Sequence, residues 1–211
     1  MIGFYNYTVV ATYLATLLGL CGIFFSLEGQ VFSAIVCLLL AGLLDTVDGR
    51  IARTKKDRTA DEQRFGIQID SLNDVICFGV LPATAGYTLC RAHMETLPLW
   101  CKATLGFFLL AGLIRLAYFN VLEEERQQTE GGTERRYYLG LPITASTLVF
   151  PALYLLGRLF PGAAPAILCG GLLLTGLLYI TPLRLRHPNG IAIVGMAAVG
   201  AAELAGLLLL R

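Results

Sequence analysis

Charged residues are scarce in this 211-residue chain. Asp, Glu, Lys and Arg together make up 15% of it, whereas a soluble domain carries about 25%. Hydrophobic residues make up 56%, and the mean hydropathy is +0.68. This shortage of charge excludes an ordinary soluble globular domain. The net charge of +1 indicates no particular partner by itself, and we expect no nucleic acid polymer among the partners.

Cysteine pairs at metal-binding or redox spacing are also lacking. The chain has no CxxC pair, and its six cysteines are scattered through apolar segments without a neighbouring histidine. They predict small buried hydrophobic side chains rather than disulfides or a zinc site. No internal repeat, low-complexity tract or interdomain linker is visible, so we expect a single membrane-embedded domain over residues 1–211.

Long apolar runs are what the chain has instead. A spanning helix needs about 20 predominantly apolar residues. The sequence contains seven segments of this kind, at 8–27, 31–49, 66–91, 98–122, 139–158, 163–182 and 190–210. They predict an all-α polytopic transmembrane helix bundle with about seven spanning helices. The first segment lacks a basic n-region and a cleavage site, so we expect a retained helix and not a signal peptide.

Lys and Arg are distributed unevenly between the two ends of these segments. The connections after the second, fourth and sixth segments hold six, three and two of the 16 basic residues, whereas the opposite side holds four and Arg115 lies inside the fourth segment. By the positive-inside rule, the richer side is cytoplasmic. We therefore expect an integral protein of a prokaryotic cell membrane, with its site at the cytoplasmic face.

Four aspartates interrupt the apolar pattern near this face. Asp45 and Asp48 are three residues apart, and Asp70 and Asp74 are four apart, so on helices each pair shares one face. One carboxylate near a helix centre in a bilayer costs about 2.5–3.5 kcal/mol, so we expect positive charge among the four. Two such helices side by side would form a cage of oxygen ligands, which suits Mg²⁺ or Mn²⁺ rather than zinc.

Small residues and an arginine accompany the carboxylates. Gly49 directly follows the first acidic pair and Gly66 precedes the second, so a ligand can approach the backbone at both points. Ala52 continues the small face, and Arg53 supplies a planar fork suited to phosphate. Carboxylates for metal, glycines for close approach and an arginine for phosphate together indicate phosphoryl transfer.

These positions match a known signature. The pattern Asp45-x2-Asp48-Gly49-x2-Ala52-Arg53, then Gly66-x3-Asp70-x3-Asp74, resembles that of the CDP-alcohol phosphotransferases, integral membrane enzymes of phospholipid synthesis. All eight positions are filled, but the twelve residues 54–65 between the two halves form a longer loop than the family usually has.

The flanking sequence is most similar to the membrane-type phosphatidylserine synthases within that family. The similar segments are FGIQIDSLNDVICFGVLPA (65–83), RLAYFNV (115–121) and GLPITA (140–145). Tyr118 and Thr144 stand where that subfamily usually has arginine and proline.

The resemblance implies a mechanism and its residues. Mg²⁺ or Mn²⁺ would be bound by the aspartates and would hold the pyrophosphate of CDP-diacylglycerol, while Asp74 would deprotonate the hydroxyl of L-serine, giving phosphatidylserine and CMP. The implied metal-site residues are Asp45, Asp48, Asp70 and Asp74. The implied CDP-binding residues are Asp45, Gly49, Ala52, Arg53 and Gly66. By the same resemblance we expect membrane lipid as a partner and a homodimer.

Several alternatives stay open at this stage. Arg115 and Asn120 would recognise the serine carboxylate, or Arg115 would only neutralise the aspartates. Arg184 and Arg186 would bind substrate anions, or would only reflect the positive-inside pattern. The acceptor could instead be glycerol phosphate, inositol phosphate or choline. A cation transporter is the rival from another class, although transporter sites usually lie near the midplane in a repeat architecture.

Overall fold

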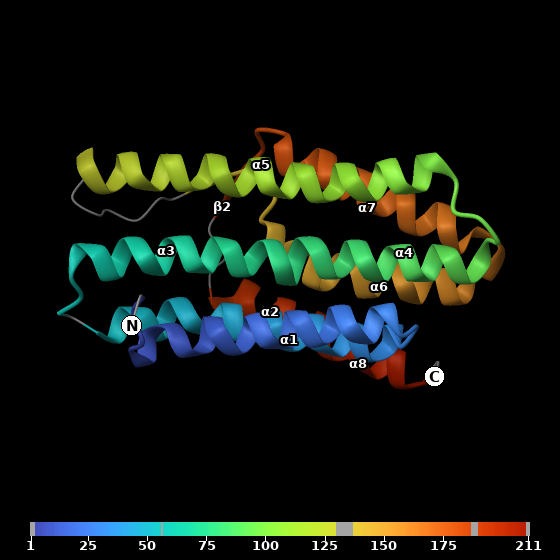
Figure 1. Cartoon of the computed structure of the whole chain (residues 1–211), viewed down its shortest axis with the longest axis horizontal. Coiled ribbons are helices and arrows are strands. Elements are labelled where there is room, and N and C mark those ends of the chain that lie inside the picture. The colour runs from blue at the N-terminus through green and yellow to red at the C-terminus, as the bar shows by residue number, and fades with distance from the viewer. Residues whose placement is uncertain (1–2, 56, 130–136, 187–189, 210–211) are drawn as a thin grey trace.

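The computed structural model describes residues 3–55, 57–129, 137–186 and 190–209, and it is a bundle of long helices lying side by side (Figure 1). Each of the seven apolar segments predicted from the sequence contains a helix. The α-helices are α1 (Val10–Leu27), α2 (Val31–Thr54), α3 (Ala60–Asp74), α4 (Leu81–His93), α5 (Leu99–Thr129), α6 (Ser146–Leu159), α7 (Ala164–Ile180) and α8 (Gly190–Leu209). Short helical turns precede three of them: η1 (Tyr7–Val9), η3 (Ile143–Ala145) and η4 (Pro161–Ala163).

The helices have the length and apolarity of membrane spans. Among the described residues, six are long and apolar enough to cross a bilayer, and the segment containing α6, Ile143–Leu159, is apolar but shorter. Large apolar side chains point outward along them, for example Leu17 on α1 and Leu174 on α7, each 58% exposed. Such surfaces are stable in contact with lipid tails. The chain is therefore an integral membrane protein built as a helix bundle.

The third predicted segment forms one continuous rod of three parts. The rod consists of α3, a π-helical segment η2 (Val75–Val80) and α4. Within η2, the Phe78 carbonyl accepts a hydrogen bond of 2.9 Å from the Ser146 hydroxyl, so a polar backbone group in the wider turn is paired in the apolar core. Asp74 is the last α-helical residue before this change of pitch.

The rod begins earlier than the apolar pattern predicts. Residues 54–65 were expected to form a loop, but α2 extends to Thr54 and α3 starts at Ala60. Thr59 caps α3: its hydroxyl accepts from the Glu62 N–H at 3.1 Å, and the Glu62 carboxylate accepts from the Thr59 N–H at 3.0 Å. This reciprocal pair satisfies N–H groups at the helix start. The connection is consequently much shorter than predicted.

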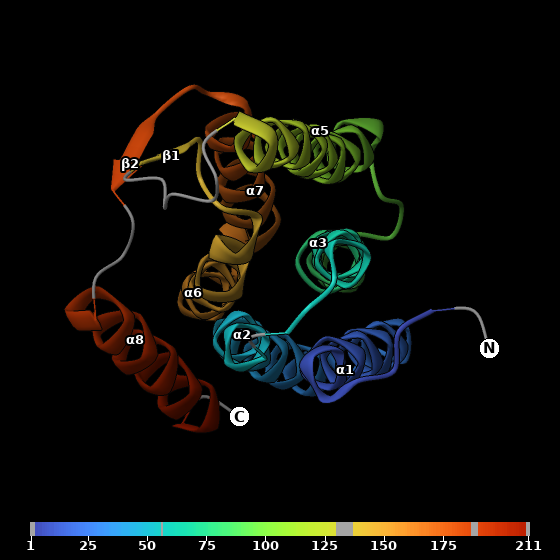
Figure 2. The same cartoon turned by 90° about the vertical axis from the view of Figure 1, so that its left-hand side faces the viewer.

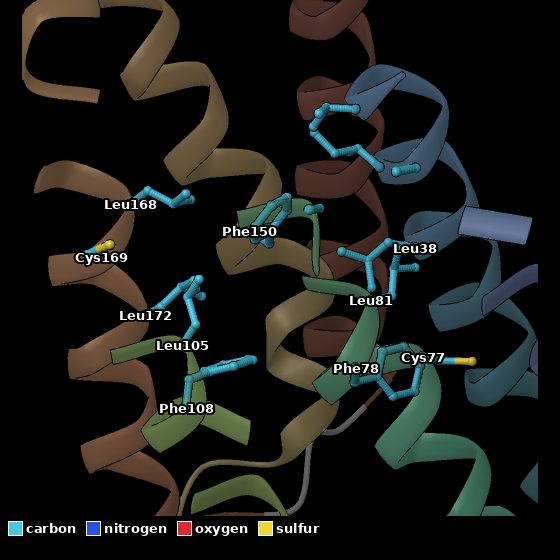
Figure 3. Close-up of a cluster of buried hydrophobic side chains, with 14 of the residues drawn as sticks. Leu38, Cys77, Phe78, Leu81, Leu105, Phe108, Phe150, Leu168, Cys169 and Leu172 are labelled. Atoms are coloured by element: carbon cyan, nitrogen blue, oxygen red, sulfur yellow. The ribbon is translucent and has the colours of Figure 1, made fainter. Parts of the chain in front are cut away.

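Viewed from the end that carries this connection, α3 lies between α1, α2 and α5, with α6 and α7 completing the bundle (Figure 2). A close approach fixes α1 against the rod: a Cβ at Gly19 would come within 2.6 Å of the Cys77 sulfur. Figure 3 shows the core beside this contact, where Phe78 and Leu81 of the rod meet side chains from α2, α5, α6 and α7. The rod is therefore packed on several sides.

The last elements lie at the edge of the bundle. Strands β1 (Tyr137–Leu139) and β2 (Arg184–Arg186) pair antiparallel, with Tyr137 opposite Arg186. Gly140 follows β1 with φ +76°, and a Cβ there would lie 2.6 Å from the Tyr179 carbonyl oxygen, so this turn requires glycine. Residues 139–142 were predicted to be helical and instead form this strand end and turn. Helix α8 packs on α6 and α2 at the periphery.

Candidate active site

Four aspartates from two helices converge at one end of the bundle. Asp45 and Asp48 project from α2, and Asp70 and Asp74 from α3. Carboxylate oxygens of Asp45, Asp48 and Asp70 all lie within 4.8 Å of one another. The Asp74 carboxyl group interacts with that of Asp45 and is 8% exposed. The two acidic pairs therefore face a shared centre.

Helix α1 supplies hydroxyl groups that orient this cluster. Thr12 donates to an oxygen of Asp48 at 3.2 Å, and Thr16 donates to the side-chain oxygen of Asn73 at 2.9 Å. Asn73 stands beside Asp74 in the sequence and is 1% exposed. Hydrogen bonds from outside a ligand set fix the orientation of the ligands. The sequence reasoning missed both threonines, because no local spacing relates α1 to the signature.

A cavity of about 160 Å³ opens beside the carboxylates. It lies between the two acidic helices and α1. Three of the five predicted CDP-binding residues line it, namely Gly49, Ala52 and Gly66, together with the predicted metal ligands Asp48 and Asp70. A Cβ at Gly49 would meet no atom within 4 Å, so this glycine borders open space. The cavity thus has the small-residue walls that the sequence predicted.

Arg58 is a cationic residue of this cavity that the sequence reasoning did not assign. It lies in the connection between α2 and α3, and its Nη2 donates to the Glu62 carbonyl at 3.2 Å. The same nitrogen would be 2.6 Å from a Cβ at Gly66, so the missing side chain of Gly66 makes room for the guanidinium. Arg58 lines the same cavity as Asp48 and Asp70, but its described hydrogen bond is to the Glu62 carbonyl and not to an aspartate. The unusual length of segment 54–65 was the sequence feature that could have drawn attention to Arg58.

Arg115 and Asn120, the predicted acceptor-binding residues, both lie on α5. Asn120 accepts a hydrogen bond of 2.9 Å from Ser71, the residue next to Asp70. Arg115 is 8% exposed, and its guanidinium lies over the Phe119 ring at 5.9 Å. Tyr179 is within electrostatic range of both Arg115 and Asp74. Helix α5 therefore presents one amide and one cation toward the acidic side of the rod.

Three predicted site residues have backbones within described elements, while their side chains lie outside the described part of the structure. They are Arg53 near the end of α2 and Arg184 and Arg186 in β2. The backbone of Arg53 belongs to the same helix as the first two aspartates, one residue beyond Ala52.

The donor set fits a hard divalent cation. All the converging groups are carboxylates, and hard cations such as Mg²⁺ and Mn²⁺ prefer oxygen ligands. One oxygen of Asp70 and one of Asp74 are buried without a hydrogen-bond partner among the described residues. A buried carboxylate oxygen in that state is costly unless a cation or proton compensates it. These residues therefore suit a metal centre.

A larger cavity of about 420 Å³ lies at the opposite end of the bundle, lined by residues of α4, α6 and α7. It contains no carboxylate among the described residues that line it.

Several known proteins are similar to this chain in sequence. Archaetidylserine synthase of Methanothermobacter thermautotrophicus is 35% identical over 140 residues, which cover 66% of this chain and 53% of that protein. CDP-diacylglycerol–serine O-phosphatidyltransferase of Helicobacter pylori J99 is 29% identical over 180 residues, covering 82% and 67%. The enzyme of that name from Saccharomyces cerevisiae is 31% identical over 156 residues, covering 69% and 53%.

The chain thus spans about half to two thirds of the length of these relatives. The CDP-alcohol phosphatidyltransferase family model matches residues 5–180. That range contains both acidic helices, the cavity and the helix that carries Arg115. On this match, the chain belongs to the CDP-alcohol phosphatidyltransferase family.

Proposed function

We propose that this chain transfers the phosphatidyl group of CDP-diacylglycerol to L-serine, forming phosphatidylserine and CMP. The observation that carries the proposal is the convergence of Asp45, Asp48 and Asp70 from two helices, with Asp74 beside them. The family match and the names of the Helicobacter and yeast relatives support serine as the acceptor.

The carboxylates of Asp45, Asp48 and Asp70, with Asp74 adjacent, are proposed to hold Mg²⁺ or Mn²⁺. Bound there, the cation would neutralise the charge that develops on the pyrophosphate during transfer. Thr12 keeps one oxygen of Asp48 engaged, so the carboxylate has a preferred orientation before substrate arrives.

The CDP moiety is proposed to occupy the cavity between α2, α3 and α1. Gly49 and Ala52 let the nucleotide approach the backbone of α2. Gly66 makes room for the Arg58 guanidinium, which offers N–H donors to phosphate oxygens. By resemblance, Asp45 and Arg53 complete the CDP contacts. The diacylglycerol tails would stay in the bilayer, since the cavity is too small to enclose them.

Asp74 is proposed as the base. Its carboxylate would take the proton of the serine hydroxyl, the serine oxygen would form a bond to the lipid-bearing phosphorus, and the bond from that phosphorus to the bridging oxygen would break to release CMP. Its burial beside Asp45 excludes bulk water from the group that accepts the proton.

Serine recognition is proposed to involve Arg115 and Asn120, because α5 carries them toward the acidic side of the rod. The Ser71–Asn120 hydrogen bond ties that helix to the residue next to Asp70. Arg184 and Arg186 are further candidates for binding substrate anions or lipid headgroups.

We also propose the setting of the enzyme. The connection between α2 and α3 is rich in Lys and Arg, which supports a cytoplasmic position for the site in a prokaryotic cell membrane. The chain is proposed to act as one membrane-embedded domain and, as is common in the family, as a homodimer.

The test is CMP release from CDP-diacylglycerol by the purified chain with a panel of alcohols: L-serine, glycerol phosphate, inositol phosphate and choline. We expect stimulation by serine alone, loss of activity in EDTA, and recovery on addition of Mg²⁺ or Mn²⁺. Stimulation by another alcohol would reject serine as the acceptor. Full activity in chelator would reject the metal-dependent mechanism, and no CMP release with any alcohol would reject the transferase.

A further inference from the structure

Three cysteines from three helices meet at the end of the bundle opposite the acidic site. Cys90 lies near the end of α4, Cys101 near the start of α5 and Cys169 in α7. Their sulfur atoms all lie within 4.8 Å of one another, and those of Cys90 and Cys169 are 3.8 Å apart. The side chains are 0%, 0% and 2% exposed. The three are far apart in the sequence, so no spacing motif reveals them.

The separation of the sulfurs suits a shared metal ion. A zinc–sulfur bond is about 2.3 Å long, which places sulfurs bound to one ion roughly 3.8–4.0 Å apart in tetrahedral or trigonal geometry. The Cys90–Cys169 distance already has this value. None of the six cysteines is in a disulfide, so all three thiols are available as ligands.

The surroundings favour a divalent, thiophilic ion. Figure 3 shows Cys169 on α7 among Leu168, Leu172 and other apolar side chains. Three thiolates and one divalent ion leave a single negative charge, whereas a monovalent ion would leave two, and buried charge is costly. Cys90 lines the 420 Å³ cavity, so the cavity offers a path for the ion.

We propose that Cys90, Cys101 and Cys169 form a binding site for a soft divalent cation of the zinc and cadmium class, separate from the hard-cation site at the aspartates. Binding exchanges three thiol protons for one ion. The ion joins α4, α5 and α7, which are otherwise held together at this end by apolar packing.

Cadmium titration of the full-length chain tests the proposal. Protein purified in detergent, kept reduced and stripped with chelator, is titrated with Cd²⁺ while the ultraviolet thiolate-to-cadmium charge-transfer band is recorded. We expect a band that saturates at one equivalent and is displaced by Zn²⁺. The band reports sulfur ligation only, so cadmium at the aspartates does not contribute, and the readout is independent of CMP release.

Cys169→Ala is expected to abolish the saturable band. The matched control is Cys37→Ala, which removes a buried cysteine of α2 outside the cluster and is expected to keep it. Should Cys169→Ala fail to fold, Cys101→Ala serves in its place. The proposal is overturned if the wild-type chain gives no saturable band, or if the band survives the loss of Cys101 or Cys169. A count of four free thiols in unreduced protein would also overturn it, because that count indicates a disulfide.

Discussion

Asp74 differs from the other aspartates in its surroundings. The ligand atoms of Asp45, Asp48 and Asp70 group together, whereas Asp74 lies beside this group and contacts it through Asp45. We expect Asp74→Asn to retain binding of metal and CDP-diacylglycerol but to lower the rate of CMP release by about 10²–10⁴-fold, the usual contribution of a general base. Binding is measured by equilibrium titration with the CDP-lipid and turnover by CMP release. A variant with normal turnover would contradict the assignment of the base.

Gly49 borders space that no protein atom fills. Because a Cβ there meets nothing within 4 Å, Gly49→Ala should leave folding intact and obstruct only a ligand. Overpacking of this kind costs about 1–3 kcal/mol, so we expect KM for CDP-diacylglycerol to rise by roughly 5- to 150-fold. The measurement is steady-state CMP release at varied CDP-lipid.

Gly106→Ala is the matched control for this variant. A Cβ at Gly106 on α5 would also meet no atom within 4 Å, but this glycine lies away from the acidic cavity, and its replacement should leave KM unchanged. Equal effects of the two substitutions would mean that helix propensity, and not the nucleotide, explains the loss.

The sequence predicts the relative positions of site residues that lie on the same helix. The i,i+3 and i,i+4 spacings of the aspartates are local, and the sequence alone predicted that each pair occupies one face. Thr12 and Arg58 were missed because their roles depend on how α1 and the α2–α3 connection pack against those faces. A sequence pattern does not report such tertiary contacts.

At the scale of elements, the start of α3 depends on a polar cap. Thr59 and Glu62 bond reciprocally, and Glu62 also accepts from Lys55 at 2.7 Å and from Asn6 at 2.9 Å. We expect Thr59→Ala to lower the free energy of unfolding by about 1 kcal/mol. Thermal unfolding in detergent measures the change.

Thr181→Ala is the control for the cap. Thr181 follows α7, and its exposed hydroxyl donates to the Leu177 carbonyl. Its loss should have little effect, because it removes no N-terminal cap. A Thr59→Ala chain as stable as wild type would show that the capping box contributes nothing measurable in the bundle.

The apolar cores of the helices were predicted well, and their polar ends were not. Hydropathy indicated segments at 66–91 and 98–122, but α3 begins at Ala60 and α5 continues to Thr129. Hydropathy detects the part of a helix that lies in lipid, whereas capping and side-chain pairs extend a helix into water. The capping motif around Thr59 was present in the sequence and could have predicted the earlier start of α3.

At the scale of the whole molecule, the α2–α3 connection, which contributes Arg58 to the acidic cavity, and the α4–α5 connection lie at opposite ends of the bundle (Figure 1). If the acidic end is cytoplasmic, a membrane-impermeant maleimide should label Asp57→Cys only in inside-out vesicles and Glu95→Cys only in intact cells. Both positions are exposed. The exposed native Cys21 is first replaced by serine. The Cys21→Ser chain without an introduced cysteine is the control, and its maleimide labelling gives the background.

The reverse labelling pattern would place the site on the other side of the membrane and overturn the proposed cytoplasmic location. Labelling of both positions in the same preparation would instead indicate that the vesicles have mixed orientation. A protein of known topology in the same membrane serves as the control for vesicle orientation.

The π-helical segment Val75–Val80 also constrains how this rod can change in evolution. An α-helix advances about 100° per residue, and a π-helical turn holds more residues than an α-helical one, so deleting one residue from this stretch would change the rotation of α4 relative to Asp70 and Asp74. Either the aspartates or the apolar side chains of α4 would then face the wrong neighbours. Insertions and deletions should therefore be tolerated in the connections at either end of the rod and selected against in its middle.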